Sequence, residues 1–196
     1  MKIIESVFEM REYSQKLKRD GLTIGSVDTE GCLHEGHISL IKAAQENCDV
    51  VVLNISHSEN YFNCSSKKYN KRLEIYEKTL IEKDKEICVL NKVDVLFAPS
   101  METLYLDTPA LNSNIIKSEH PTFPLESFKF ISGFHSIFKT VIPDVILLGE
   151  KDVHQNVVVK SLINRLKLPI KVIIAPTARD PDGLAFSSRN RFLTKV

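Results

Sequence analysis

The amino-acid sequence predicts an α/β fold, a Rossmann-like parallel sheet with helices on both faces. Short apolar runs rich in β-branched residues alternate with stretches in which apolar residues recur at helical spacing. This alternation indicates a mostly parallel sheet, because parallel strands are joined by crossovers that usually contain a helix. The 196 residues are enough for one domain with a sizeable core, and no repeat or low-complexity tract is present.

Five strands and five helices follow from this pattern. The strands are expected at residues 22–27, 50–55, 93–98, 145–148 and 170–174. The helices are expected near residues 5–18, 37–47, 67–88, 128–141 and 152–166. The long connection at residues 105–127 contains three prolines among polar residues, which predicts a partly irregular segment over the ligand site. We expect a single domain over residues 1–196.

The composition favours a globular protein with a small-molecule ligand. Hydrophobic residues make up 43% of the chain, which argues against disorder, and the net charge of +1 gives no basic excess for nucleic acid. No apolar run approaches the roughly 20 residues of a membrane span, and the first residues lack a signal-peptide core. The cysteines have no metal-binding spacing, so we expect reduced thiols at Cys32, Cys48, Cys64 and Cys88. These features predict a cytoplasmic protein with no nucleic-acid or membrane partner.

Two histidines, His34 and His37, lie three residues apart at a predicted strand-to-helix turn. The expected strand at residues 22–27 precedes them, and Ile38 and Ile41 belong to the helical spacing that follows. The first N–H groups of a helix have no partner within the helix, and together with the helix dipole they form an anion site. Imidazoles add hydrogen-bond donors whose charge changes near neutral pH. The turn therefore predicts a phosphate-binding site.

Two later segments also carry side chains suited to phosphate. GEKDVHQ at residues 149–155 places Lys151 and Asp152 at a predicted helix start, after a glycine that permits close approach of the backbone. SSRN at residues 187–190 places two hydroxyls beside Arg189. Taken alone, each segment is compatible with an ordinary capped turn. Because the carboxyl ends of parallel strands share one edge of a sheet, we expect these segments to meet the histidines there.

These motifs resemble a known enzyme family. HxGH and the late SSRN segment are similar to the nucleotidyltransferase superfamily, whose KMSKS-like loop the SSR run resembles. More narrowly, LHEGHISLI, VDVLFAPS, GEKD, PDGLA and SSRNRFL, in this order, resemble the pantoate–beta-alanine ligase family from about residue 20 onward. The resemblance implies that ATP and pantoate form pantoyl adenylate with release of pyrophosphate. Beta-alanine would then attack the adenylate to give pantothenate and AMP.

The resemblance also implies roles for individual residues. His34, His37 and Lys151 would be the catalytic residues, with His37 in the position of the proton donor. The residues implied to bind the nucleotide are Glu30, Gly31, His34, His37, Gly149, Lys151, Asp152, Ala178, Ser187, Ser188 and Arg189. Tyr61 and Gln155 would contact the acid substrate. The implied small molecules are ATP with Mg²⁺, a carboxylic acid and beta-alanine, and the implied assembly is a homodimer; the metal ligands stay unassigned.

The sequence departs from the family pattern where the acid would bind. The family's PTMG is DTEG at residues 28–31, so carboxylates at Asp28 and Glu30 replace a proline and a methionine. The family's FVNPTQF is SHSENYF here, and its RPGHFRG aligns with FPLESFK at residues 123–129, which removes both arginines and the histidine. Gained carboxylates and lost cations should disfavour a small carboxylate such as pantoate.

Three functions therefore stay open at this point. The first is a ligase of this family with a divergent acid pocket. The second is a related enzyme that adenylates or nucleotidylates another substrate, and the third is a nucleotide-binding protein without ligase activity. The chain ends at Val196, about where the family's smaller C-terminal domain would begin, so we expect that domain to be absent. In the charged helix at residues 67–88, Glu82 or Asp84 could approach magnesium, but a solvated helix face is the favoured prediction.

Overall fold

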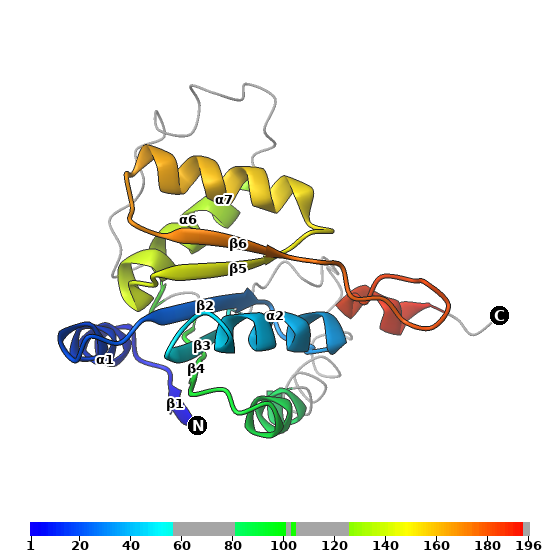
Figure 1. The fold of residues 1–196 in the computed structure, drawn as a ribbon, viewed down its shortest axis with the longest axis horizontal. Coiled ribbons are helices and arrows are strands. Elements are labelled where there is room, and N and C mark those ends of the chain that lie inside the picture. Colours follow the sequence, from blue (N-terminus) through cyan, green and yellow to red (C-terminus); the bar gives the residue numbers. More distant parts are fainter. Residues whose placement is uncertain (57–80, 101–102, 105–125, 194–196) are drawn as a thin grey trace, which may run out of the picture.

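The fold is organised around a six-stranded parallel sheet in the order β1-β4-β3-β2-β5-β6 (Figure 1). It is seen in a computed structural model, which describes residues 1–56, 81–100, 103–104 and 126–193. The strands are β1 (Lys2–Ile4), β2 (Ile24–Thr29), β3 (Val50–Ile55), β4 (Val95–Phe97), β5 (Val145–Gly149) and β6 (Lys171–Ala175). The predicted Rossmann-like architecture is confirmed.

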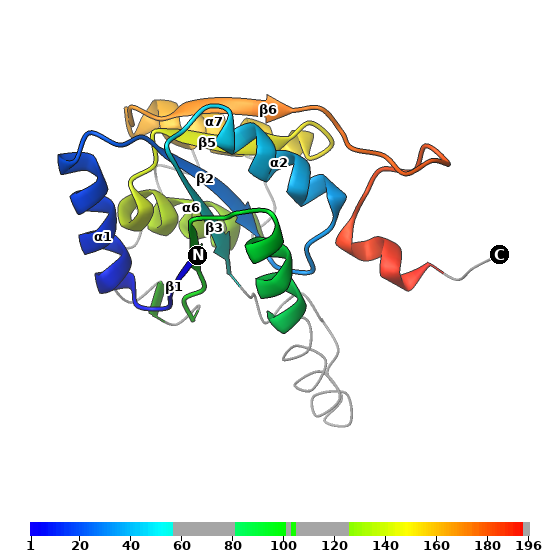
Figure 2. The same ribbon diagram turned by 60° about the horizontal axis from the view of Figure 1, so that its bottom comes forward.

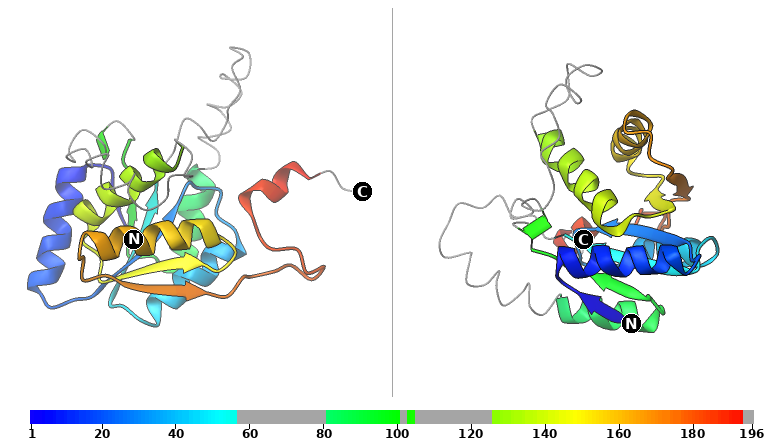
Figure 3. Two further views of the ribbon diagram at one scale, coloured as in Figure 1. Left: turned by 90° about the horizontal axis from the view of Figure 1, so that it is seen from above. Right: turned by 90° about the vertical axis from the view of Figure 1, so that its left-hand side faces the viewer.

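Helices cover both faces of the sheet, as Figures 1 and 3 show. α1 (Val7–Arg19), α6 (Glu126–Val141) and α7 (Val153–Arg165) share one apolar core with the sheet. α2 (Glu35–Gln45) and the helical residues 81–90 contribute to the second core, on the other face. The burial of every residue of β3 and β4 reflects this double cover. Among the described helices, none has the length and apolar character needed to cross a membrane.

The first strand, β1, is a correction to the sequence analysis, which expected only a helix at the N-terminus. β1 forms the edge of the sheet and pairs with β4. It has three residues, of which only Ile4 is buried, so its sequence carries too little pattern to be recognised. The first part of the helix expected at residues 67–88 and most of the irregular connection expected at residues 105–127 lie outside the described residues.

The strand order reverses between β2 and β5. The chain passes from β2 to β3 and β4 on one side, then crosses to β5 and β6 on the other. β2 pairs with β5, and β5 pairs with β6, so their carboxyl ends lie side by side. Ligands of open parallel sheets bind beyond the carboxyl ends of the strands at such a switch point. The three segments singled out in the sequence follow these three strands.

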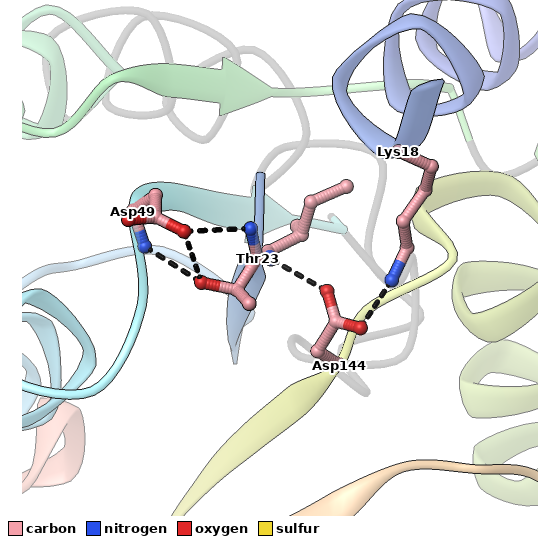
Figure 4. A network of polar contacts seen from close by, with 5 residues as sticks. Lys18, Thr23, Asp49 and Asp144 are labelled. Carbon is pink, nitrogen blue, oxygen red and sulfur yellow. Dashed lines mark hydrogen bonds and ion pairs between the residues drawn. The ribbon is translucent and has the colours of Figure 1, made fainter. Parts of the chain in front are cut away.

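Asp144 links four elements at the amino ends of the strands, opposite the candidate site (Figure 4). Its carboxylate accepts a hydrogen bond from Ile24 N at 2.8 Å and forms an ion pair with Lys18 of α1. Its backbone N–H donates to Ile24 O, and its carbonyl accepts from Lys171 N, each at 2.8 Å. One residue thus links the starts of β2, β5 and β6 to the last turn of α1. These contacts fix the register of β2, β5 and β6, whose carboxyl ends carry the candidate site.

Replacing Asp144 by Ala should therefore destabilise the whole fold. The change removes the partner of a backbone N–H and of Lys18, and the expected loss in the free energy of unfolding is about 2 kcal/mol. Urea denaturation of the variant measures it. Asp20→Ala, at an exposed carboxylate, is the control and should change stability little. Equal stability of the two variants would contradict the role given to Asp144.

Candidate nucleotide-binding site

The turn between β2 and α2 is held in place by Asp84. The Asp84 side chain is almost fully buried, and it accepts hydrogen bonds from Cys32 N at 2.7 Å and from Leu33 N at 2.8 Å. The turn needs such a support because Gly31 and Cys32 both have positive φ, at 92° and 55°. A cysteine is rarely found in this conformation. The prediction of a solvated face is therefore wrong for Asp84, which stabilises the turn that carries both histidines.

His34 and His37 each accept a backbone hydrogen bond at Nδ1. His34 is the N-cap of α2, and its Nδ1 accepts from Gly36 N at 3.1 Å. The Nδ1 atom of His37 accepts from His34 N at 3.3 Å, which completes a capping box. A nitrogen that accepts a hydrogen bond carries no proton, so in both neutral rings the proton lies on Nε2. The turn therefore sets the tautomer of both histidines.

Both imidazoles are neutral at physiological pH. Burial lowers the pKa of His34 to about 4 and that of His37 to about 3. The positive charge of Lys151 lowers both pKa values further, and His34 has the same effect on His37. Neutral rings with Nε2–H groups are hydrogen-bond donors that keep the Nδ1 bonds to the backbone intact. At pH 7 the positive charge of this group comes from Lys151.

The glycine within HxGH is required by the His34 ring. A Cβ atom at Gly36 would lie 2.9 Å from Cε1 and 3.0 Å from Nδ1 of His34. No real contact between such atoms is that short, so a side chain at this position would displace the ring. The rings of His34 and His37 stack with centroids 4.0 Å apart and an angle of 26° between their planes. Gly36 thus allows the first ring to fold back over the helix start.

A hairpin after β6 brings the late motifs to the histidines. Arg179 and Ala185 form an antiparallel bridge, and Gly183 occupies the tight turn with a φ of 85°. The hairpin ends at Phe186, whose carbonyl accepts a hydrogen bond from Lys151 Nζ at 2.9 Å. This contact joins the segment after β6 to the segment after β5. Figure 2 shows the next element, η2 (Ser188–Phe192), beside the N-terminus of α2.

The SSRN segment begins η2 and contributes a cation. The hydroxyl of Ser187 accepts from Arg189 N at 3.3 Å and caps this short helix. The pKa of Glu30 is raised by partial burial and lowered by the positive charge of Arg189, so these two side chains influence each other across the site. In this structure Glu30 therefore partly offsets the positive charge that Arg189 would offer to phosphate.

Asp152, in the segment after β5, has an exposed carboxylate near the backbone of Gly149. Asp152 is the N-cap residue of α7 but makes no side-chain capping hydrogen bond. The Glu150 carboxylate accepts from both N and Oγ1 of Thr177 at 3.1 Å, which fixes the backbone beside Ala178. These contacts hold the ends of β5 and β6 together. An exposed carboxylate and a fixed backbone are suited to binding hydroxyl and amide groups.

Asp28 of β2 forms a second polar group together with Ser26 and Asn54. Asp28 accepts hydrogen bonds from Asn54 Nδ2 at 2.8 Å and from Ser26 Oγ at 3.2 Å. Burial raises the pKa of Asp28 to about 7, although both hydrogen bonds act to lower it. In the described part of the chain, the buried Oδ1 atom of Asn54 has no hydrogen-bond partner. Asp28 is therefore a carboxyl group that changes charge near neutral pH.

The structure brings together most of the residues singled out in the sequence. His34, His37, Lys151 and the segment from Ala178 to Arg189 converge beyond β2, β5 and β6, as the alternation of strands and helices predicted. Gln155 is half-buried in the first turn of α7, and Tyr61 lies outside the described residues. Two contributions were not foreseen from the sequence. Asp84 was considered only as a possible approach to magnesium or part of a solvated face, not as a support of the turn, and Phe186 was not singled out because it resembles any apolar residue after a turn.

Comparisons with known proteins agree with this arrangement. The family model described as Pantoate-beta-alanine ligase matches residues 2–196. The chain is 36% identical to the pantothenate synthetase of Hydrogenovibrio crunogenus, over 100% of this chain and 69% of that protein. It is 35% identical to the pantothenate synthetase of Moorella thermoacetica, over 99% and 68% respectively. A crystal structure of pantoate-beta-alanine ligase from Francisella tularensis, complexed with beta-gamma ATP and beta-alanine, matches with a TM-score of 0.78 and 32% identity, over 99% of this chain and 74% of that one.

Removing the carboxylate of Asp84 should destabilise the protein in a graded way. Asp84→Ala leaves two backbone N–H groups without their partner, at an expected cost of about 3 kcal/mol. Asp84→Asn keeps one acceptor oxygen and should lose about half as much. Chemical denaturation of both variants, with the exposed Glu86→Ala as the control on the same helix, measures the difference. Variants as stable as the control would contradict the support of the turn by Asp84.

Replacing Asp28 by Asn should stabilise the protein more at high pH than at low pH. Between pH 4 and 7 the folded protein keeps a proton on Asp28 that the unfolded chain releases, so stability falls as the pH rises through this range. The neutral Asn removes this fall, which has an upper bound of roughly 4 kcal/mol. Melting temperatures at pH 5 and pH 8 test it, with Asp182→Asn as an exposed control. A gain of the same size at both pH values would contradict the prediction.

Proposed function

The chain belongs to the pantoate-beta-alanine ligase family, and from this premise we propose that it joins pantoate to beta-alanine at the expense of ATP. The observation that carries the proposal is the convergence of two neutral histidines with Lys151 beyond three parallel strands. In the first step a pantoate carboxylate oxygen attacks the α-phosphorus, and the bond to pyrophosphate breaks. In the second step the amine of beta-alanine attacks the acyl carbon, AMP leaves and the amine loses a proton.

We propose that His34 donates directly to a phosphate oxygen. Its Nδ1 atom is held by Gly36 N, and among the described residues no group binds its Nε2–H. Lys151 supplies positive charge beside it and would exchange Phe186 O for phosphate when ATP binds. Displacement at phosphorus depends on positioning and on neutralising charge rather than on a covalent nucleophile. A neutral donor and a nearby cation meet both needs.

His37 would act on the phosphate only indirectly, through the His34 ring on which it stacks. Its Nε2–H donates to Thr29 Oγ1 at 3.2 Å, and the same oxygen accepts from Gly31 N at 3.1 Å. For His37 to reach a phosphate or to give up a proton, as the family resemblance implies, it must first leave Thr29. With Thr29 as its partner, its role is to support the His34 ring by stacking and to hold the turn closed.

The remaining nucleotide contacts are those that the family resemblance implies. The Asp152 carboxylate and the backbone at Gly149 would hold the ribose, and the backbone near Ala178 would meet adenine. Ser187, Ser188 and Arg189 would bind phosphate from the hairpin side. Mg²⁺ would enter with ATP, because this ion usually keeps water ligands and takes the others from substrate phosphates. In the described ranges no three His, Cys, Asp or Glu side chains are grouped to hold a metal ion by themselves.

A second candidate is a ligase whose acid substrate is not pantoate. The polar group of Ser26, Asp28 and Asn54 favours it, because a family proline is replaced by a carboxyl group that is partly charged at pH 7. A charged Asp28 near the acid site would repel a carboxylate. Gln155 would offer its amide to the acid, and Tyr61, which lies outside the described residues, would offer its phenol hydroxyl. A homodimer and a cytoplasmic location also remain predictions.

Pyrophosphate release in the presence of ATP and Mg²⁺ tests the proposed function. We expect release that depends on pantoate, and pantothenate as the product when beta-alanine is added. Release with another acid from a panel, but not with pantoate, would favour the second candidate. Binding of ATP without release for any acid would leave a nucleotide-binding protein, and no binding of ATP would reject all three.

Variants of the phosphate-binding residues should slow the first step. His34→Ala and Lys151→Ala each remove a donor aimed at developing negative charge, so we expect kcat/KM for ATP to fall about a hundredfold. Lys160→Ala, at an exposed lysine of α7, is the matched control and should keep the wild-type rate. If Lys151→Ala and Lys160→Ala had equal rates, the role given to Lys151 would be wrong.

A further inference from the structure

We propose that Phe186 is a positioning residue that holds the His34 ring in the orientation in which Nε2–H faces the nucleotide. The proposal rests on the proposed function, because it assigns a support to the phosphate donor of that site. Neither the motifs singled out in the sequence nor the matched family description assigns a role to this side chain. Its basis is a set of contacts between segments about 150 positions apart in the chain.

Three aromatic rings from two segments lie close together. The Phe186 ring is 6.4 Å from the His34 ring, centroid to centroid, with 22° between the planes. His34 also stacks on His37, at 4.0 Å and 26°. Nearly parallel, offset rings attract one another, so both contacts favour the observed orientation of the His34 ring. The ring of His34 thus has two aromatic neighbours.

The backbone of Phe186 is fixed on both sides of its Cα. Its N–H donates to Ala178 O at 3.0 Å, and its carbonyl accepts from Lys151 Nζ at 2.9 Å. The hairpin before it is closed by Asp180, whose carboxylate accepts from Asp182 N and Leu184 N at 3.1 and 2.9 Å. A fixed backbone gives the ring little freedom to move away from His34. The hairpin therefore acts as a rigid arm with Phe186 at its end.

The contact at Gly36 explains why His34 needs this support. The hydrogen bond from Gly36 N fixes one atom of the imidazole, but the ring can still rotate about that bond. A Cβ atom at Gly36 would lie 3.6 Å from Cβ of Phe186, so Phe186 also closes the space above the helix start. Because the planes of His37 and Phe186 both lie within 26° of the His34 plane, these two neighbours restrict the plane of the His34 ring. The direction of Nε2–H is then restricted as well.

The Phe186 ring also bears on the pKa of His34. Burial is the largest cause of the low pKa of His34, and the Phe186 ring stacks beside it, so we expect its removal to expose His34 to water. The charged or titratable side chains around this ring are Lys151 from the β5–α7 turn, His37 from α2, and Glu30 and Arg189 across the site. All of these remain when Phe186 is replaced. A change in the His34 pKa therefore reports the loss of the ring itself.

Replacing Phe186 by Ala in the full chain tests the proposal with two readouts. NMR titration of the His34 ring should show its pKa rising from about 4 toward the ordinary value of 6.5. The kcat of acid-dependent pyrophosphate release should fall about tenfold, because the donor is no longer held in one direction. Leu184→Ala, an exposed position of the same hairpin, is the matched control and should change neither.

The two readouts separate this proposal from the proposed function. A raised His34 pKa together with a lower kcat supports the positioning role, and an unchanged pKa overturns it whatever the rate. Wild-type protein that releases no pyrophosphate with any acid would reject the function, while the titration still decides the contact between Phe186 and His34. If Phe186→Ala does not fold, Phe186→Leu keeps most of the volume without the flat ring. Because Leu cannot stack on the His34 ring, kcat should still fall relative to Leu184→Ala, and a wild-type kcat for Phe186→Leu overturns the proposal.

Discussion

The two hydrogen bonds from backbone N–H groups to Nδ1 of His34 and His37 are the constraint on which the rest of the site depends. They place the proton of each ring on Nε2, and burial beside Lys151 keeps both rings neutral at pH 7. The helix start then holds two neutral donors, and the backbone determines which nitrogen of each ring carries the proton. An imidazolium would give up the Nδ1 acceptor, and with it the capping box that shapes the turn.

Other features of the molecule hold this arrangement in place. Gly36 makes room for the first ring, Asp84 holds two N–H groups of a turn with positive φ, and Thr29 accepts from the second ring. The parallel sheet brings β2, β5 and β6 into adjacent positions, so Lys151 and the hairpin arrive at the same helix start. The groups that would position a substrate thus come from segments that are far apart in the sequence and meet at the carboxyl ends of the strands.

The sequence predicted the parts of this structure that depend on local pattern. β3 and β5 are mostly apolar and buried, so their composition identifies them, whereas β1 has only Ile4 buried and gives no periodic signal. The convergence of the three motifs followed from a general property of parallel sheets. Asp84 and Phe186 could not be recognised in this way. Each acts on a partner about 50 or 150 positions away, and neither residue type is unusual where it stands.

The family resemblance alone does not identify the acid substrate, and Asp28 is the reason. Asp28 stands where the family pattern has proline, and the structure gives it two hydrogen-bond partners and a pKa of about 7. Its charge therefore depends on conditions under which the enzyme works. The nucleotide side brings His34, His37 and Lys151 together, whereas Asp28 is a departure from the family pattern.

Long-range ¹H–¹⁵N NMR spectroscopy of the imidazole nitrogens at pH 7 tests the central claim most directly. This measurement distinguishes a protonated nitrogen from an unprotonated one in each ring. The account predicts that His34 and His37 are both neutral, with the proton on Nε2 and a lone pair on Nδ1. An imidazolium at either position, or a proton on Nδ1 of either ring, would contradict it.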